Sequence, residues 1–180
     1  MRDQLDAVTM RADKFPSGQK DNSSPELEFR MASLADTILL SALHDLCFKP
    51  ILNEPWTPDT FAQLIAMPGT TALIAIRHED LATVGFLIFR VAADECEIIS
   101  LGVDPGARRQ AVATRLLAHI YGHIQAAGAA RVFLEVAADN SAARSFYQNH
   151  GFIEVGVRLG YYARSGAART DAAVLRLDLP

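Results

Sequence analysis

The stretch EIISLGVDPGARRQAVAT, residues 97 to 114, holds two different patterns joined by a turn. Its first seven residues form a short apolar run with β-branched side chains, and Asp104-Pro105-Gly106 then gives a strong turn signal. Beyond the turn, apolar side chains recur at the spacing of one helix face, at Val112, Leu116, Leu117, Ile120, Tyr121 and Ile124. The stretch therefore predicts a strand, a tight turn of small and basic residues, and a helix.

The turn between this strand and helix combines small side chains with two arginines, Arg108 and Arg109. The first turn of a helix leaves backbone N–H groups unpaired and carries the positive end of the helix dipole. Because small side chains also let an anion approach the backbone, the turn is suited to bind phosphate or pyrophosphate. Plain capping with a solvated basic face is the alternative that the turn leaves open.

The segments on either side of this unit predict a mixed sheet. Apolar runs at 71–77 and 81–92 lead into the quoted strand as an antiparallel meander, and the apolar run 131–136 follows the helix. A strand, a helix and a second strand linked in this way form a parallel pair. The basic turn then lies at the carboxyl end of the first strand, where open α/β sheets bind ligands.

The ends of the chain supply the remaining elements. A strand at 27–31 precedes a helix that begins at Ser33 or Asp36 and is expected to carry one apolar face, made of Leu34, Ile38, Leu39, Ala42, Leu43 and Leu46. Thr57 and Pro58 start a second helix as N-cap and first helical residue. A further helix ends at Gly151, and strands at 152–157 and 172–179 close the chain, joined through Tyr161-Tyr162 and a loop over 163–170. We therefore predict an α/β fold: a mixed sheet of about seven strands, mostly antiparallel with a central parallel pair, with helices on both faces.

Composition limits the class of protein. Residues 1–25 are polar and interrupted by Pro and Gly, which predicts a disordered or accessory arm before one domain over residues 26–180. A net charge of −4 argues against nucleic-acid binding as the main function. Cys47 and Cys96 lack metal-ligand spacing and are expected to be buried free thiols in a reducing cytosol. No apolar run reaches membrane-spanning length and no hydrophobic signal region is present, so we expect a cytoplasmic protein.

Three residues downstream of the parallel pair are candidates for chemistry. Glu135 interrupts an apolar strand, where a partly desolvated carboxylate can accept a proton directly or through a water. The alternative is that it pairs with an arginine such as Arg131 or points to solvent. Asn140 and Tyr147 lie on the next helix, where an N-cap and a half-buried aromatic are the structural alternatives.

Other candidates favour structural explanations. His119 and His123 lie four residues apart on the long helix, but no third ligand accompanies them, so a solvated face is expected and no metal. Trp56, Tyr161 and Tyr162 are expected either to line an acceptor groove or to pack at its rim.

Two groups of motifs resemble a known family. Val103-Asp104-Pro105 followed by RRQAVA at 108–113 resembles the acetyl-coenzyme A signature of the GNAT N-acetyltransferases, Gln/Arg-x-x-Gly-x-Gly/Ala. Arg108 and Ala113 match it, whereas Ala111 stands where the family normally has glycine. LEV at 134–136, NSAARSFY at 140–147 and GF at 151–152 resemble the C-terminal motif of the RimI-type ribosomal-protein alanine N-acetyltransferases within that family. The resemblance covers roughly residues 26 to 179.

The resemblance implies a role for each matching position. Glu135 would be the general base that deprotonates the incoming ammonium, and Tyr147 the general acid that protonates the departing coenzyme A thiolate. The backbone of 101–103 would pair with the pantetheine arm, and that of 109–114 would hold the pyrophosphate. The cofactor-binding residues on this reading are Leu101, Gly102, Val103, Arg108, Arg109, Gln110, Ala111, Val112, Ala113, Thr114 and Asn140.

The implied function is direct acetyl transfer in a ternary complex, with acetyl-coenzyme A as cosubstrate, no metal and no covalent acetyl-enzyme. The implied acceptor is a protein N-terminal α-amine, that of an alanine on a ribosomal protein of the bS18 kind, without direct nucleic-acid or membrane partners. Two alternatives stay open at this point. One is the same chemistry on a small amine or a lysine side chain, and the other is an acyl-coenzyme A-binding module without transfer activity, suggested by Ala111.

Overall fold

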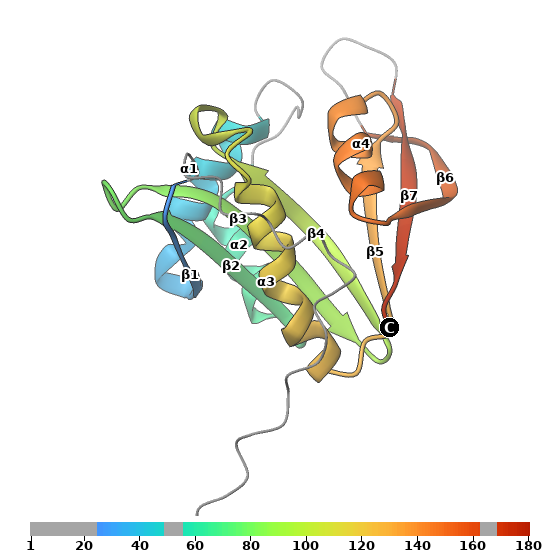
Figure 1. Ribbon diagram of the computed structural model, residues 1–180, viewed down its shortest axis with the longest axis horizontal. Coiled ribbons are helices and arrows are strands. Elements are labelled where there is room, and N and C mark those ends of the chain that lie inside the picture. Colours follow the sequence, from blue (N-terminus) through green and yellow to red (C-terminus); the bar gives the residue numbers. More distant parts are fainter. Residues whose placement is uncertain (1–24, 49–55, 163–168) are drawn as a thin grey trace, which may run out of the picture.

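The computed structural model describes residues 25–48, 56–162 and 169–180 (Figure 1). Residues 1–24 of the predicted arm and 163–168 of the expected connection lie outside the described residues. The strands are β1 Leu27–Met31, β2 Thr70–Arg77, β3 Thr83–Ala92, β4 Glu95–Val103, β5 Arg131–Ala137, β6 Ile153–Tyr162 and β7 Thr170–Asp178. The helices are α1 Thr37–Phe48, α2 Pro58–Ala66, α3 Val112–Ala126 and α4 Ser141–Asn149, with short 3₁₀ turns η1 Leu34–Asp36 and η2 Pro105–Ala107.

The strands form one seven-stranded sheet in the order β1-β2-β3-β4-β5-β7-β6, which confirms the predicted mixed sheet. All neighbours are antiparallel except β4 and β5. This parallel pairing runs only from Glu95 opposite Arg131 to Ile98 opposite Leu134. Beyond that point the two strands diverge, as Figure 1 shows, and the carboxyl-terminal part of β4 has no partner on the β5 side.

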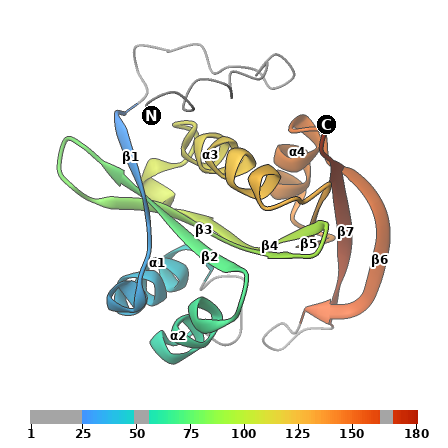
Figure 2. The same ribbon diagram turned by 90° about the horizontal axis from the view of Figure 1, so that it is seen from below.

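Helices cover both faces of the sheet (Figure 2). The pair α1 and α2 lies on one face, and α3 and α4 lie on the other. Each face has its own core: the α3 side buries residues such as Leu87, Leu116 and Leu134, and the α1 side buries Phe61 and Phe86. Among the described elements, α1 and α2 contact β2, β3 and β4, and no helix covers β5 and β7 on that face (Figure 2).

Helix α3 confirms the face predicted from its spacing, because Val112, Leu116, Leu117, Ile120, Tyr121 and Ile124 are all buried. The helix packs closely on β3 at Gly85, where a Cβ atom would lie 2.9 Å from Val112 Cγ1 and 3.0 Å from Leu116 Cδ1. The small residue lets the start of α3 lie directly on the sheet. This contact sets the position of the basic turn, residues 108–111, that precedes the helix.

Two sequence predictions are wrong in detail. Helix α1 does not bury the expected face, since Leu34, Ile38, Leu39 and Leu46 are exposed, while Leu40, Leu43, His44 and Cys47 are buried. Apolar residues surround this helix, so its own periodicity does not select the buried side. Strand β6 continues past Val157 to Tyr162, so the two tyrosines belong to the strand and not to the connection.

Three other expectations, on the cysteines, Thr57 and Gly151, are met by the described residues. Both cysteines are free and buried. Thr57 caps α2 by accepting a hydrogen bond from the Thr60 amide at 3.2 Å, with Pro58 as the first helical residue. Gly151 has a positive φ of 86° after α4, as a left-handed helix end requires. No helix in the described part of the chain is long and apolar enough to span a membrane.

Candidate active site

Within the part of the chain that the structure describes, the carboxyl-terminal half of β4 has one free edge. Leu101, Gly102 and Val103 pair with β3 on one side, opposite Leu87, Phe86 and Gly85, and lie beyond the last pair with β5 on the other. The backbone N–H and C=O groups of this edge can therefore bind an extended ligand as an added strand would. Glycine is required at the middle position, because a Cβ on Gly102 would lie 2.4 Å from the Phe86 ring.

The turn before α3 has the form of an anion site. Asp104 Oδ1 accepts a hydrogen bond from the Gly106 amide at 2.7 Å and starts the turn. Arg109 and Ala111 both adopt positive φ angles, 61° and 59°, and Ala111 is the N-cap residue of α3. The first amide to donate to a carbonyl at this helix start is that of Arg115, to Ala111 at 3.0 Å. Among the described residues, the amides of 109–114 have no hydrogen-bond partner outside the helix itself.

The side chains of this turn divide into two groups. Arg108 points back toward the sheet and α1, donating to the carbonyls of Val103 and Cys47 at 3.4 Å each. Gln110 Nε2 donates to the Gly106 carbonyl at 3.2 Å, while Arg109 is exposed. Arg108, although exposed like Arg109, therefore links the end of β4 to the end of α1. Backbone amides and Arg109 are left to meet an anion.

Glu135 lies on β5 just beyond its last pair with β4, and its side chain is 22% exposed. Its Oε1 accepts a hydrogen bond from Arg158 of β6 at 2.5 Å. The alternative that Glu135 pairs with an arginine is thus confirmed, with Arg158 in place of the suggested Arg131, whose guanidinium binds Asp94 at 2.6 Å. Four residues along a strand place the two side chains about 13 Å apart on the same face, out of contact.

Tyrosines of β6 support the same carboxylate. Tyr162 donates its hydroxyl hydrogen to the backbone carbonyl of Glu135 at 3.2 Å, and burial raises the pKa of Tyr162 to about 12. Burial, and after it the interaction with Glu135, raise the pKa of Tyr161. The Arg158 guanidinium lies over the Tyr161 ring at 4.5 Å from its centroid. Their arrangement depends on the pairing of β6 with β7 and of β7 with β5, which no local pattern encodes.

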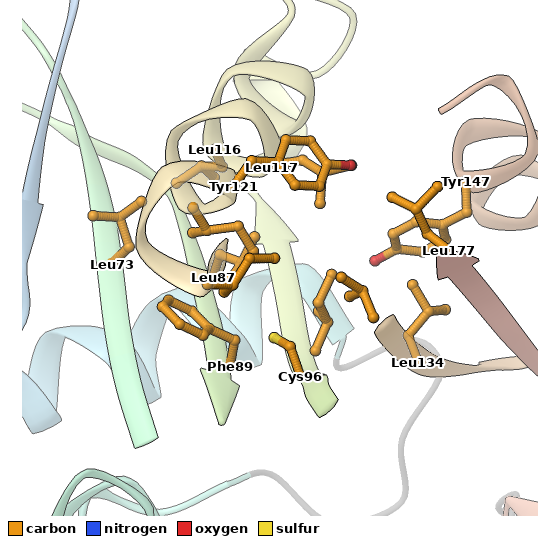
Figure 3. Close-up of a cluster of buried hydrophobic side chains, with 14 of the residues drawn as sticks. Leu73, Leu87, Phe89, Cys96, Leu116, Leu117, Tyr121, Leu134, Tyr147 and Leu177 are labelled. Carbon is orange, nitrogen blue, oxygen red and sulfur yellow. The ribbon is translucent and has the colours of Figure 1, made fainter. Parts of the chain in front are cut away.

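Tyr147 lies on the opposite side of the sheet. It is 8% exposed and belongs to the core on the α3 side. Figure 3 shows its ring pointing away from α4, so that its hydroxyl and that of Tyr121 enter the same space between the helices. Burial, with smaller effects from Tyr162 and Tyr121, raises the pKa of Tyr147. A tyrosine in this environment keeps its proton at neutral pH.

Asn140 serves as the N-cap of α4, because its Oδ1 accepts from the Ala143 amide at 3.1 Å. Trp56 is a packing residue, stacked on buried His44 with ring centroids 4.6 Å apart. His119 and His123 lie next to one another on α3, with ring centroids 5.8 Å apart. Within the described ranges, no group of three or more His, Cys, Asp or Glu side chains is close enough to hold a metal ion.

A cavity of about 290 Å³ lies beside Glu135. Its lining comes from β3, β4, β5 and β7, including Arg90, Glu97, Phe133, Glu135 and Val174. Leu134 and Val136 belong to the core on the α3 side, so Glu135 faces the other side, where the helices leave β5 open. The two candidate catalytic side chains, Glu135 and Tyr147, thus lie on opposite faces at the place where β4 and β5 part.

A protein-family match covers the residues of this site. The model of the acetyltransferase (GNAT) family matches residues 39–152, which include the free edge, the basic turn and both candidate catalytic residues. The chain belongs to the GNAT acetyltransferase family. It is an acetyl-coenzyme A-dependent N-acetyltransferase, as its closer relatives also indicate.

Several of these relatives share an activity. The chain is 32% identical over 125 residues to the [ribosomal protein bS18]-alanine N-acetyltransferase of Escherichia coli K12, covering 69% of this chain and 82% of that protein. It is also 32% identical over 132 residues to the N-alpha-acetyltransferase RimI of Mycobacterium tuberculosis, covering 70% and 77%. The crystal structure of the ribosomal-protein-S18-alanine N-acetyltransferase from Escherichia coli matches with a TM-score of 0.75 and 25% identity, over 85% of this chain and 94% of that one.

The described residues fit acetyl-coenzyme A as the family's donor substrate. The free edge of β4 offers hydrogen bonds to an extended arm, and the unpaired amides at the start of α3 offer them to a pyrophosphate. The Ala111 methyl does not fill this turn, because the residue is exposed and its positive φ is the conformation that glycine would adopt there. The turn thus keeps the backbone shape that suits an anion.

Proposed function

We propose that the protein transfers the acetyl group of acetyl-coenzyme A to the α-amine of a protein N-terminus, that of an alanine on a ribosomal protein of the bS18 kind. The observation that carries this proposal is the placement of Glu135 and Tyr147 on opposite faces of the point where β4 and β5 diverge. An amine reaching Glu135 from the open face meets a thioester bound along the free edge of β4. The relatives at 32% identity support the choice of a terminal amine as acceptor.

On this proposal the backbone holds the donor. Leu101, Gly102 and Val103 pair with the pantetheine arm, which places the thioester carbonyl beside the gap. The amides from Arg109 to Thr114 bind the pyrophosphate, with the exposed Arg109 adding charge. Arg108 supports donor binding indirectly, because its hydrogen bond to the Val103 carbonyl holds the end of β4. Asn140 contacts the bound cofactor from the start of α4, where it is the N-cap.

Glu135 accepts a proton from the acceptor ammonium, directly or through a water, because only the neutral amine attacks the carbonyl carbon. Arg158 binds Oε1, and Tyr161 also interacts with the Glu135 side chain, so both orient the carboxylate that receives the proton. The new C–N bond forms as the carbonyl π electrons move to oxygen. Their return expels the thiolate, Tyr147 protonates the sulfur from the other face, and the new amide nitrogen releases its remaining extra proton to solvent. A terminal α-amine has a pKa near 8, so a modest base suffices.

No cysteine takes part in this scheme. Burial raises the pKa of the Cys47 thiol to about 11 and that of Cys96 to about 12, which leaves almost no thiolate at neutral pH. Neither side chain is accessible to a bound thioester without rearrangement of the core. Transfer is therefore direct, with both substrates bound together.

The test compares two peptides of the same sequence with acetyl-coenzyme A as donor. One has a free N-terminal alanine, and the other is N-terminally blocked but contains a lysine. We expect acetylation of the first alone. Activity only on the blocked peptide would reject the terminal-amine proposal in favour of lysine acetylation. Acetyl-coenzyme A binding without turnover on either peptide, or on a panel of small amines, would indicate a binding module.

A further inference from the structure

The face of the sheet that carries Glu135 also carries a row of side chains from neighbouring strands. Successive cross-strand partners from β2 to β7 are Thr70, Arg90, Glu97, Phe133 and Arg176. Directly paired residues on adjacent strands point to the same face. Since side chains alternate along a strand, Glu135, two residues after Phe133, shares that face.

The cavity beside Glu135 connects it with part of this row. Arg90, Glu97 and Phe133 line the same space of about 290 Å³. Strands lie about 4.8 Å apart and rise about 3.3 Å per residue, which places the Cα atoms of Glu97 and Glu135 about 8 Å apart. About two residues of an extended chain cover that distance. An acceptor whose amine is at Glu135 and whose chain follows the cavity therefore passes Glu97.

Glu97 differs from the other two carboxylates of the cavity. Glu135 is paired with Arg158, and Glu95 lies 3.4 Å from the Arg131 guanidinium. Glu97 is exposed and forms no ion pair with any residue that the structure describes. An accessible carboxylate inside a cavity attracts a cation. Among the described residues, Arg158 interacts with Glu97 only at longer range, because its guanidinium is paired with Glu135.

Arg90 supplies a complementary donor. It faces Glu97 across the β3–β4 ladder, yet the two do not form an ion pair. Its Nε atom is buried and has no hydrogen-bond partner among the described residues. A buried donor without a partner is costly, and a small movement of the Arg90 side chain would let this atom donate to an acceptor carbonyl in the cavity.

We propose that Glu97 is a specificity-determining residue that binds a lysine or arginine side chain at the second or third position of the acceptor, while Arg90 donates to an acceptor carbonyl. The inference rests on the proposed function, since it assumes that a peptide amine is acetylated at Glu135. It adds a preference that the reaction itself does not require: basic side chains next to the terminal residue.

The experiment uses alanine-terminal peptides that differ only by Arg, Gln or Glu, placed in turn at position two and at position three. Kinetics are measured for the full-length protein and for Glu97→Gln, Glu97→Arg and a control, Glu79→Gln, which removes the same charge from an exposed turn far from the cavity. For at least one position we expect kcat/KM of the wild type to be about threefold to tenfold higher for the Arg peptide than for the Gln peptide. The difference should lie in a lower KM, with kcat unchanged. Added salt should reduce this preference.

The variants decide the assignment. In Glu97→Gln the Arg-to-Gln ratio should fall to about one, and Glu97→Arg should favour the Glu peptide, while Glu79→Gln should keep the wild-type ratio. A wild-type preference that persists in Glu97→Gln, or equal use of all peptides by the wild type, would overturn the role of Glu97 and leave the proposed function standing. If no alanine-terminal peptide is acetylated, the proposed function fails and the subsite with it.

Discussion

Replacing Ala111 with glycine should stabilise the protein. Ala111 adopts a left-handed conformation at the N-cap of α3, with φ 59° and ψ 13°. A residue with a Cβ atom loses about 1–2 kcal/mol in that conformation relative to glycine. Glycine has more freedom in the unfolded chain, which offsets about 0.4–1 kcal/mol of the gain. The net increase in the free energy of unfolding is therefore about 0.5–1 kcal/mol, or roughly 1–4 °C in melting temperature for a domain of this size.

The assay is thermal unfolding of Ala111→Gly beside a matched control, Ala118→Gly. Ala118 is exposed within the same helix, where the same change should lower the free energy of unfolding by about 1 kcal/mol. Opposite shifts of the two melting temperatures are expected. Calorimetric titration should also show that acetyl-coenzyme A binds to Ala111→Gly and to the wild type with similar affinity, because the Ala111 methyl does not fill the turn. Equal destabilisation by both changes would refute a left-handed Ala111.

Three further predictions concern stability. Gly102→Ala places a methyl 2.4 Å from the buried Phe86 ring and should cost about 1–3 kcal/mol, seen as a fall in melting temperature; an unchanged value would mean that Phe86 yields freely. Burial lowers the pKa of His44 to about 4, so the unfolded chain binds more protons than the folded protein between about pH 6.5 and 4. Up to about 3 kcal/mol of the free energy of unfolding should therefore be lost as pH falls through that window. His44→Phe should reduce this pH dependence in denaturant titrations, and an unchanged pH dependence would show that His44 is not its cause. Thr57→Ala removes the α2 cap and should cost about 1 kcal/mol in urea unfolding, whereas Thr57→Ser should cost little.

Much of the fold could be predicted because its signals are local. The buried face of α3 follows from one apolar stripe, and the parallel pair follows from a strand, a helix and a strand with a short crossover. Helix α1 could not be oriented, since it is apolar on several sides and only contact with α2 and the sheet selects Leu40 and Leu43 for burial. The strand predicted at 152–157 ends before the observed end of β6 at Tyr162, because glycines interrupt the sequence pattern and this edge strand has no alternation of apolar and polar residues.

The candidate site was predictable residue by residue but not as an arrangement. Glu135 and Tyr147 are recognisable by motif, yet their placement on opposite faces depends on the divergence of β4 and β5. The Arg158 partner of Glu135 depends on the register of two further strand pairs. The left-handed Ala111 gives no signal in sequence, because alanine normally indicates a helix interior.

The most direct test of the site is the steady-state acetylation of an alanine-terminal peptide by Glu135→Gln and Tyr147→Phe, with acetyl-coenzyme A affinity measured in parallel. Each variant should lower kcat by about 10²- to 10⁴-fold, the usual contribution of a general acid or base, while acetyl-coenzyme A binds as in the wild type. Wild-type kcat in either variant would remove that residue from the mechanism. Wild-type kcat in both would contradict proton transfer from the two faces of the gap between β4 and β5.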